Sequence, residues 1–324
     1  QQLLAPYPTE QFLTEHWTQK AIHISTDDSR KFHPFFSWGA LNHLLNYHKL
    51  AGQDLSFSKE GKSLPETRDR RDWSDRLRQG ATLIINGVHQ RVPSVAKLAA
   101  QLRDEIGYET HINLYCSPAD QRGFDCHYDT HDVLILQIDG EKKWFVYRET
   151  VLYPTSDMPS SKQLQPTDPP YLECVLKAGD LLYIPRGHWH YAIANEQPSL
   201  HLTVGIECQT GLDWLSWLMQ DLKNNPNWRQ RLPAIGDDNT KALEQLIALR
   251  SHLIETLHQP DILHKFIDKL SYRNYPPLPV SLPAMMGTDI FPNLLMTRFA
   301  WSPLHRIRVK QLSEKHYQIQ VGSK

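Results

Sequence analysis

The chain has 324 residues, 40% of them hydrophobic and 22% charged, and its 35 basic and 36 acidic side chains give a net charge of −1. A chain of this length can bury a sizeable core, and its balanced charge argues against a global electrostatic hold on nucleic acid. Cys116, Cys126, Cys174 and Cys208 form no CxxC pair, so neither a disulfide framework nor a zinc ribbon is predicted. The apolar runs are too short to span a bilayer, and no basic-then-apolar leader opens the sequence. We therefore expect a cytoplasmic protein with no membrane partner.

The first hundred residues predict a few helices and short strands. Residues 9–20 and 37–49 each begin with a capping Thr or Ser and carry apolar residues at helical spacing, and residues 94–106 form a third such segment. Residues 81–85 are apolar and precede an Asn-Gly turn, which indicates a buried strand. Residues 58–80 are polar and charged, and we expect them to form loop and solvated surface.

From about residue 110 to residue 208 the pattern changes to short alternating or apolar segments separated by turn residues. One segment is predicted over residues 125–138 and the next over 142–147, with the hairpin signal Asp139-Gly140 between them. Residues 154–170 contain five prolines and suit an excursion between strands. Many short strands at this spacing predict a β-barrel or β-sandwich.

After residue 210 the pattern is helical again. Helices are predicted over 211–223, 240–257 and 260–271, and the middle one repeats leucine near a seven-residue rhythm. That spacing fits either an interior face or a dimer seam. Two alternating segments near the end of the chain predict a small hairpin.

The residues that carry chemistry begin with His127 and Asp129. If this segment is a strand, the two side chains project to the same face, and they supply two of the three ligands of a facial triad for non-haem Fe(II). A later histidine is needed as the third ligand, and the stretch GDLLYIPRGHWH offers both His188 and His190. His131 competes with Asp129 for the second position. From spacing alone these alternatives stay open.

The run from Asn113 to Glu207 resembles the JmjC-type oxygenases, most closely the branch of ribosomal oxygenases. The matching segments are NLYCSPADQRGFDCHYDTHDVLILQIDGEKKW and GDLLYIPRGHWHYA, and the resemblance extends to FLTEHWTQKAIHI and GATLIINGVHQRVPSVAKL at the front of the chain. The resemblance implies a mostly-β core, a double-stranded β-helix of the jelly-roll type, with N-terminal helices, so that the chain is α+β overall. It implies an oxygenase domain over 1–209 with its barrel at about 110–208, a helical dimerisation region over 210–272, and a small winged-helix-like tail over 273–324.

The resemblance also assigns roles to particular residues. It places the metal ligands at His127, Asp129 and His190. It places the basic residue that anchors the distal carboxylate of 2-oxoglutarate at Lys142. Positions expected to line the cosubstrate pocket fall on Asn113, Tyr115, His201 and Thr203. The implied cofactors are Fe(II), 2-oxoglutarate as cosubstrate, and O₂.

The activity implied is hydroxylation of a side chain, His or Arg, in a protein or peptide substrate such as a ribosomal protein. A homodimer is expected, and nucleic acid is not an expected partner. His131 and the His188-Trp189 pair depart from the family near the ligands, so the target is not carried over. Two alternatives are a tailoring oxygenase acting on a natural-product precursor peptide or a small molecule, and a non-catalytic cupin-like binding module.

Overall fold

The structure is a computed structural model, and it describes residues 2–50, 52–234, 236, 239–271, 307–314 and 316–321. The chain divides into two compact units, Gln1–Cys208 and Gln209–Lys324. Among the described residues, no helix combines the length and the apolar character that crossing a bilayer requires.

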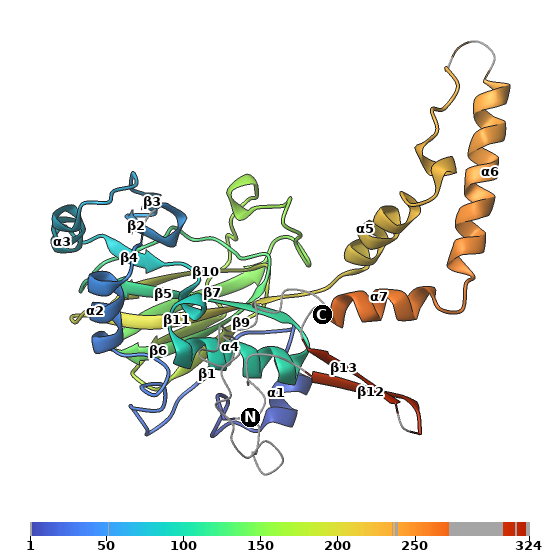
Figure 1. Cartoon of the computed structure of the whole chain (residues 1–324). Coiled ribbons are helices and arrows are strands. Elements are labelled where there is room, and N and C mark those ends of the chain that lie inside the picture. Colours follow the sequence, from blue (N-terminus) through green and yellow to red (C-terminus); the bar gives the residue numbers. More distant parts are fainter. Residues whose placement is uncertain are drawn as a thin grey trace. The chain divides into compact units, whose positions relative to one another are not determined.

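The first unit is built on a large antiparallel sheet with strand order β1-β9-β6-β11-β5-β4-β2-β3 (Figure 1). Its centre is a set of long ladders between β11 and its neighbours β5 and β6. The strands of this sheet are β1 (Ile22–Ile24), β2 (Leu55–Lys59), β3 (Lys62–Ser63), β4 (Thr82–Ile85), β5 (Glu109–Ser117), β6 (Asp132–Asp139), β9 (Leu181–Ile184) and β11 (Ser199–Glu207).

A smaller antiparallel sheet, β10-β7-β8, faces the large one. It consists of β7 (Lys142–Glu149), β8 (Leu172–Leu176) and β10 (His188–Ala194). Val133 and Ile135 of β6 pack with Trp144 and Val146 of β7 in a core between the sheets. Two facing antiparallel sheets form the jelly-roll architecture that the sequence predicted.

The other face of the large sheet is covered by helices, so β6 is buried on both sides. Leu134 and Leu136, which alternate with the inner residues of β6, lie in a second core with residues of the N-terminal helices. These helices are α1 (Thr9–Glu15), α2 (Trp38–Tyr47) and α4 (Pro93–Ile106). The Ser37 hydroxyl caps α2 by accepting from the Ala40 amide, and α4 begins with Pro93, whose missing N–H is no loss there.

Three expectations from the sequence need correction. Residues 58–80 are not all loop and surface: they contain the end of β2, β3 and α3 (Arg70–Arg78). Asp69 caps α3, and a single buried indole, Trp73, anchors it, which is too little apolar content for periodicity to reveal. Residues 125–131 are not a strand, because β6 begins only at Asp132 and His127 forms an isolated bridge with His190.

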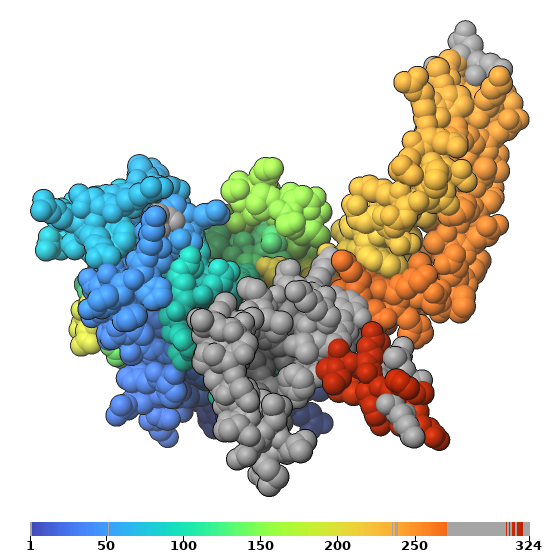
Figure 2. All heavy atoms as spheres, viewed as in Figure 1, coloured from blue at the N-terminus to red at the C-terminus, as the bar shows by residue number. Residues whose placement is uncertain are grey.

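The third correction concerns the Asp139-Gly140 turn. It lies where predicted, with Gly140 at a φ of 69°, but β6 and β7 belong to opposite sheets and do not pair as a hairpin. The chain crosses from one sheet to the other at this corner, where the side-chain Nε2 of Gln137 donates to the Asp139 carbonyl. Between β7 and β8 the Pro-rich excursion stands out as a lobe on the surface (Figure 2) and contains the short helix η3 (Ser160–Lys162).

The second unit contains the three predicted helices, α5 (Gly211–Leu222), α6 (Thr240–Leu257) and α7 (Ile262–Ser271). Thr210 and Asp213 form a reciprocal capping box at the start of α5. Leu218, Leu222 and Ile262 form a small buried cluster. The strands β12 (Ile307–Ser313) and β13 (His316–Val321) form the predicted hairpin. Most of the remaining tail, 272–306, where a winged-helix-like segment was expected, lies outside the described residues.

Candidate metal centre and cosubstrate cavity

His127 and His190 lie directly opposite each other at the edge of the small sheet. The His127 amide donates to the His190 carbonyl at 3.1 Å, and the His190 amide donates to the His127 carbonyl at 2.7 Å. Residues that exchange both backbone hydrogen bonds point their side chains to the same face. The two imidazole rings accordingly lie with their centroids 4.6 Å apart.

Asp129 completes the group. Its backbone carbonyl accepts from the Gly187 amide at 2.9 Å, which holds the segment after His127 against the turn before β10. Its Oδ2 lies 3.6 Å from His190 Nε2. One ligand atom from each of His127, Asp129 and His190 lies within 4.8 Å of the others. Although the segment is not a strand, two imidazoles and one carboxylate therefore converge as a facial triad requires.

Both histidines are held in the tautomer that a metal needs. His127 Nδ1 lies 2.8 Å from the Asp125 carbonyl, and His190 Nδ1 lies 3.0 Å from the His188 carbonyl. A carbonyl oxygen can only accept, so each Nδ1 carries the proton and each Nε2 presents a lone pair. Burial lowers the pKa of His190 to about 4, so this ring is neutral at physiological pH and ready to coordinate.

The charge on Asp129 is set by two opposing effects. Burial alone would raise the pKa of its carboxyl, but the neighbouring rings of His127 and His190 hold the pKa below its ordinary value. Asp129 is therefore an anion. The three candidate ligands together therefore carry one negative charge, which would attract a divalent cation.

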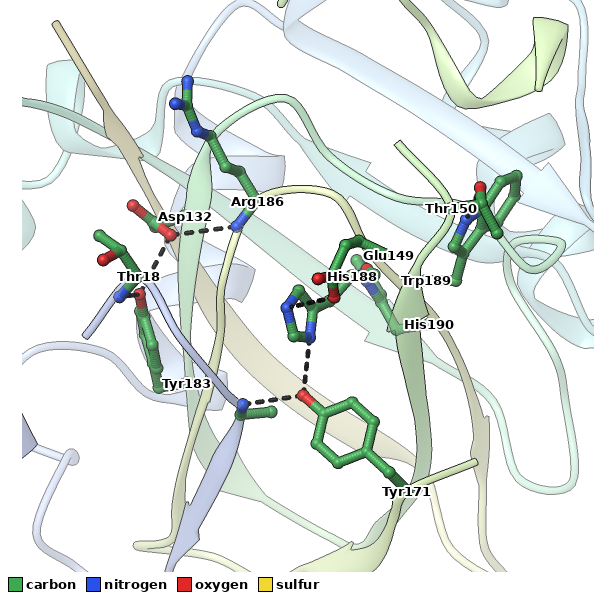
Figure 3. Close-up of polar contacts among 11 residues, drawn as sticks. Thr18, Asp132, Glu149, Thr150, Tyr171, Tyr183, Arg186, His188, Trp189 and His190 are labelled. Atoms are coloured by element: carbon green, nitrogen blue, oxygen red, sulfur yellow. Dashed lines mark hydrogen bonds and ion pairs between the residues drawn. The ribbon is translucent and has the colours of Figure 1, made fainter. Parts of the chain in front are cut away.

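His188, the alternative third ligand, is engaged elsewhere. Its Nε2 lies 3.1 Å from Glu149 Oε2, and its Nδ1 lies 2.7 Å from the Tyr171 hydroxyl (Figure 3). That hydroxyl accepts from the Ala21 amide, which leaves its own proton for His188. His188 therefore ties β10 to β7 and to the N-terminal segment, and its ring does not join His127 and Asp129.

The turn between β9 and β10 is fixed by a buried carboxylate. Asp132 Oδ1 accepts from the Arg186 amide and from the Tyr183 hydroxyl, each at 3.0 Å (Figure 3). Asp132 is the first residue of β6, three positions after Asp129. The same short segment thus supplies a candidate ligand and anchors the turn that leads to His190.

Lys142 is buried at the start of β7, with 4% of its surface exposed. Its Nζ donates to the Ser117 hydroxyl at 2.9 Å, and that hydroxyl is 3.0 Å from Thr82 Oγ1. Among the described residues no acidic side chain pairs with it. Burial lowers the pKa of the Lys142 ammonium to about 8, because a buried site disfavours the charged form.

A cavity of about 280 Å³ joins the histidines to this lysine. On β7 the residue opposite His190 is Val146, so Lys142 lies four residues along the strand and on the same face, about 13 Å away along the backbone. The walls of the cavity include every site residue predicted from the sequence except Asn113. These residues are His127, Asp129, Lys142, His190, Tyr115, His201 and Thr203.

Asn113 differs from the other predicted pocket residues. Its Oδ1 accepts from the Gly87 amide at 3.0 Å, so it ties the turn after β4 to β5. Sequence reasoning missed Trp144, which lines the cavity two residues after Lys142. The alternation of β7 could have found it, because Trp144 and Lys142 must share a face.

Two buried nitrogens in the cavity wall have no hydrogen-bond partner among the described residues, Trp144 Nε1 and His201 Nδ1. Burial lowers the pKa of His201 well below its ordinary value, with the Lys142 charge as a second cause, so its ring is neutral. Orphaned polar atoms beside an unpaired ammonium fit a bound polar anion. The three convergent ligands fit a divalent metal, so the residues present match the iron and 2-oxoglutarate that the resemblance implies.

Comparison with known proteins identifies the class of this fold and site. Residues 88–213 match the family described as the JmjC domain. The *E. coli* ribosomal oxygenase YcfD, in a structure with cobalt and 2-oxoglutarate, superposes with a TM-score of 0.62 at 17% identity, over 98% of this chain and 85% of that one. That likeness shows the fold. Residues 88–213 of the chain therefore match a JmjC domain.

Two curated proteins show which JmjC proteins this chain is similar to. A rat protein named ribosomal oxygenase 1 is 31% identical over 252 residues, which is 71% of this chain and 41% of the rat protein. A *Drosophila persimilis* protein named bifunctional lysine-specific demethylase and histidyl-hydroxylase NO66 is 28% identical over 216 residues, which is 63% of this chain and 31% of that protein. The chain is related to the ribosomal oxygenases, and it spans 31% to 41% of the length of these two curated relatives.

Proposed function

We propose that this protein is an Fe(II)- and 2-oxoglutarate-dependent oxygenase that hydroxylates a His or Arg side chain in a protein or peptide substrate. The observation that carries the proposal is the cavity itself. His127, Asp129 and His190 converge at one part of it, and the buried, unpaired ammonium of Lys142 lies at another. A non-catalytic binding module has no need of both features.

The chain's own residues have separate tasks. His127, Asp129 and His190 would hold Fe(II), and their backbone-anchored Nδ1 protons keep both Nε2 atoms facing the metal. Lys142 would bind the distal carboxylate of 2-oxoglutarate, with Ser117 orienting its ammonium. Fe(II) and 2-oxoglutarate, bound there together with O₂, would supply oxidative hydroxylation of a C–H bond, with 2-oxoglutarate converted to succinate and CO₂. No side chain is needed as a general base.

The relatives support the choice of substrate class. The rat relative is named a ribosomal oxygenase, the Drosophila relative is named a bifunctional lysine-specific demethylase and histidyl-hydroxylase, and YcfD is described as a ribosomal oxygenase. A ribosomal protein is therefore the proposed partner. The described cysteines are unpaired, which supports a reducing compartment such as the cytoplasm.

The test has two stages. Anaerobic addition of Fe(II) and 2-oxoglutarate should produce the weak visible charge-transfer band of such a complex in the wild type. The band should be absent in His127→Ala and retained in His264→Ala, which removes an exposed histidine of α7. A wild-type protein without the band would contradict the oxygenase proposal and favour a binding module.

The second stage tests the substrate. Ribosomal-protein peptides containing His or Arg are incubated with the wild type, Fe(II), 2-oxoglutarate and O₂, and mass spectrometry looks for one added oxygen atom. Loss of the product when the target residue is replaced by Ala would identify the hydroxylated position. Turnover of 2-oxoglutarate with small molecules or precursor peptides, but with no ribosomal peptide, would favour a tailoring oxygenase.

A further inference from the structure

A second group of potential metal ligands lies outside the cavity just described. One ligand atom from each of His111, His131 and Glu207 lies within 4.8 Å of the others. His111 is on β5 and Glu207 is the last residue of β11, while His131 immediately precedes β6. Strands β5 and β11 and the residue just before β6 therefore bring these side chains together, since β11 pairs with both β5 and β6.

The group continues the inner face of the barrel beyond the cavity. On β11, His201 and Thr203 line the cavity, and Gly205 and Glu207 follow on the same face. Gly205 pairs with His111 across the ladder and lies about 7 Å along the strand from Thr203. His131 lies two residues after Asp129, so the second group is a neighbour of the first.

Gly205 is the residue that allows the two imidazoles to meet. A Cβ at this position would lie 2.2 Å from His111 Cε1, 2.3 Å from its Nε2 and 2.9 Å from His131 Cδ2. The two rings therefore cross directly over the glycine, with their centroids 4.8 Å apart and their planes at 71°. A strand glycine with side chains packed over its backbone marks a close approach that any other residue would block.

The spacing within the group suits metal ligands. His111 Nδ1 lies 3.4 Å from Glu207 Oε1. Ligands at about 2.0–2.1 Å from a tetrahedral Zn²⁺ stand roughly 3.3–3.5 Å from each other, so this pair already has the required separation. The Glu207 side chain is 51% exposed, which gives an ion access and lets the carboxylate adjust.

We propose that His111, His131 and Glu207 form a second metal site, which binds Zn²⁺ through two imidazoles and one carboxylate and leaves a fourth position to water. Imidazole and carboxylate together suit a borderline cation such as Zn²⁺, and three protein ligands with one open position are a common arrangement for it. The site is separate from the triad of His127, Asp129 and His190. It adds a metal centre outside the cavity that the oxygenase activity alone does not require.

The experiment removes the first site so that the second is measured alone. In full-length protein carrying His127→Ala and Asp129→Ala, stripped of metal by a chelator, isothermal titration with Zn²⁺ should give one ion per chain. Adding Glu207→Gln, which changes an exposed side chain, should weaken that binding by more than about 100-fold, because loss of even a supporting residue typically costs 10–100-fold. Glu196→Gln, the same substitution at another exposed position, should leave it unchanged.

A second pair of variants tests the histidines. In the same background, His131→Ala should abolish binding and His264→Ala should not. Gly205→Ala should weaken it, because the added Cβ displaces the His111 ring. Co²⁺ in place of Zn²⁺ should give the visible absorption of a tetrahedral complex, and the band should vanish with Glu207→Gln.

Absence of a bound Zn²⁺ in the starting background would overturn the proposal. So would binding that survives both Glu207→Gln and His131→Ala, because the ion would then sit elsewhere on the chain. Circular dichroism of each variant verifies that the fold persists. Since the background lacks two residues of the iron triad, the result stands independently of the oxygenase proposal.

Discussion

At the scale of the residue, Lys142 has the most unusual environment in the described part of the cavity. Its ammonium is buried, donates to one neutral hydroxyl and has no acidic partner among the described residues. A protein that only needed to fold would be more stable with an apolar side chain here. The proposed function accounts for this arrangement, because the Lys142 ammonium would pair with a carboxylate of 2-oxoglutarate.

Removing this charge should weaken cosubstrate binding. A hydrogen bond to a charged group contributes about 1.5–3 kcal/mol, so Lys142→Met should raise the dissociation constant for 2-oxoglutarate by about 10- to 150-fold. Calorimetry in the presence of Mn²⁺, in place of Fe(II), measures it. Lys143→Met is the matched control, because that neighbouring side chain is partly exposed and lies 3.3 Å from Glu173 Oε2. Equal affinity in the Lys142→Met variant and the wild type would exclude Lys142 as the anchor.

The same lysine should make stability depend on pH. Its pKa is about 8 in the folded protein against 10.5 for an ordinary lysine. Between these values the unfolded chain holds a proton that the folded chain has released, so the free energy of unfolding should rise with pH across this window. The free energy of unfolding should rise by an amount on the order of 3 kcal/mol across this window. The destabilisation of the folded state has its full value below pH 8.

Urea unfolding without 2-oxoglutarate, at several pH values from 7 to 10, measures this effect as the difference between the wild type and Lys142→Met. The variant should be the more stable protein at pH 7, and the difference should shrink as pH rises. If the free energies of unfolding of the wild type and Lys142→Met changed in parallel with pH, the Lys142 charge would already be neutralised by a partner in the folded state. Lys143→Met should track the wild type throughout.

At the scale of the element, the turn between β9 and β10 controls the position of His190. Gly187 in this turn has a φ of 84°, and its amide donates to the Asp129 carbonyl. A Cβ there would meet Pro154 Cδ at 2.8 Å and the Val151 carbonyl oxygen at 3.1 Å. The turn is therefore packed against both a ligand segment and the excursion after β7.

Gly187→Ala should disturb both stability and metal binding. Forcing an alanine into this left-handed conformation costs about 1–3 kcal/mol, and the contact with Pro154 adds to it. Thermal unfolding should show the loss, and the affinity for a divalent metal should fall because Asp129 and His190 share this turn. Gly211→Ala is the control, since nothing lies within 4 Å of the added Cβ at the start of α5. Unchanged metal affinity in Gly187→Ala would mean that the turn does not position the ligands.

The elements also show what the sequence can and cannot predict. The turn at Asp139-Gly140 was correctly located from its residue types, because only local conformation is involved. That β6 and β7 belong to opposite sheets depends on long-range pairing, which no local pattern contains. The helix α3 was missed for the opposite reason: its one buried anchor, Trp73, leaves no periodicity to detect.

The candidate site follows the same division. His127 and Asp129 lie close in the sequence and could be paired by spacing, although their segment is not a strand. The choice of His190 over His188 needed the family resemblance, because both histidines fit the spacing. The group of His111, His131 and Glu207 could not be predicted, since it joins β5 and β11 across a ladder whose register only the fold sets.

At the scale of the whole molecule, the helical unit exposes more apolar surface than its small core explains. Leu218, Leu222 and Ile262 are buried together. Large apolar side chains nevertheless remain exposed along α5 and α6: Leu212, Leu215, Met219, Leu243, Leu246, Ile247, Ile254 and Leu257. Contiguous exposed apolar residues of this kind mark an interaction surface. The expected homodimer would cover it with a second copy of the same helices.

Light scattering coupled to size-exclusion chromatography tests this expectation. The wild type should elute with the mass of a dimer, and Leu243→Asp combined with Leu246→Asp should yield a monomer, because two charges would be buried in an apolar contact. Ala248→Asp is the control: it introduces the same charge at an exposed position on the opposite side of α6. Since the metal ligands lie in the other unit, the monomeric variant should still bind Fe(II) and 2-oxoglutarate. A wild type that is monomeric at micromolar concentration would contradict the expected homodimer. The exposed apolar surface would then bind a different partner.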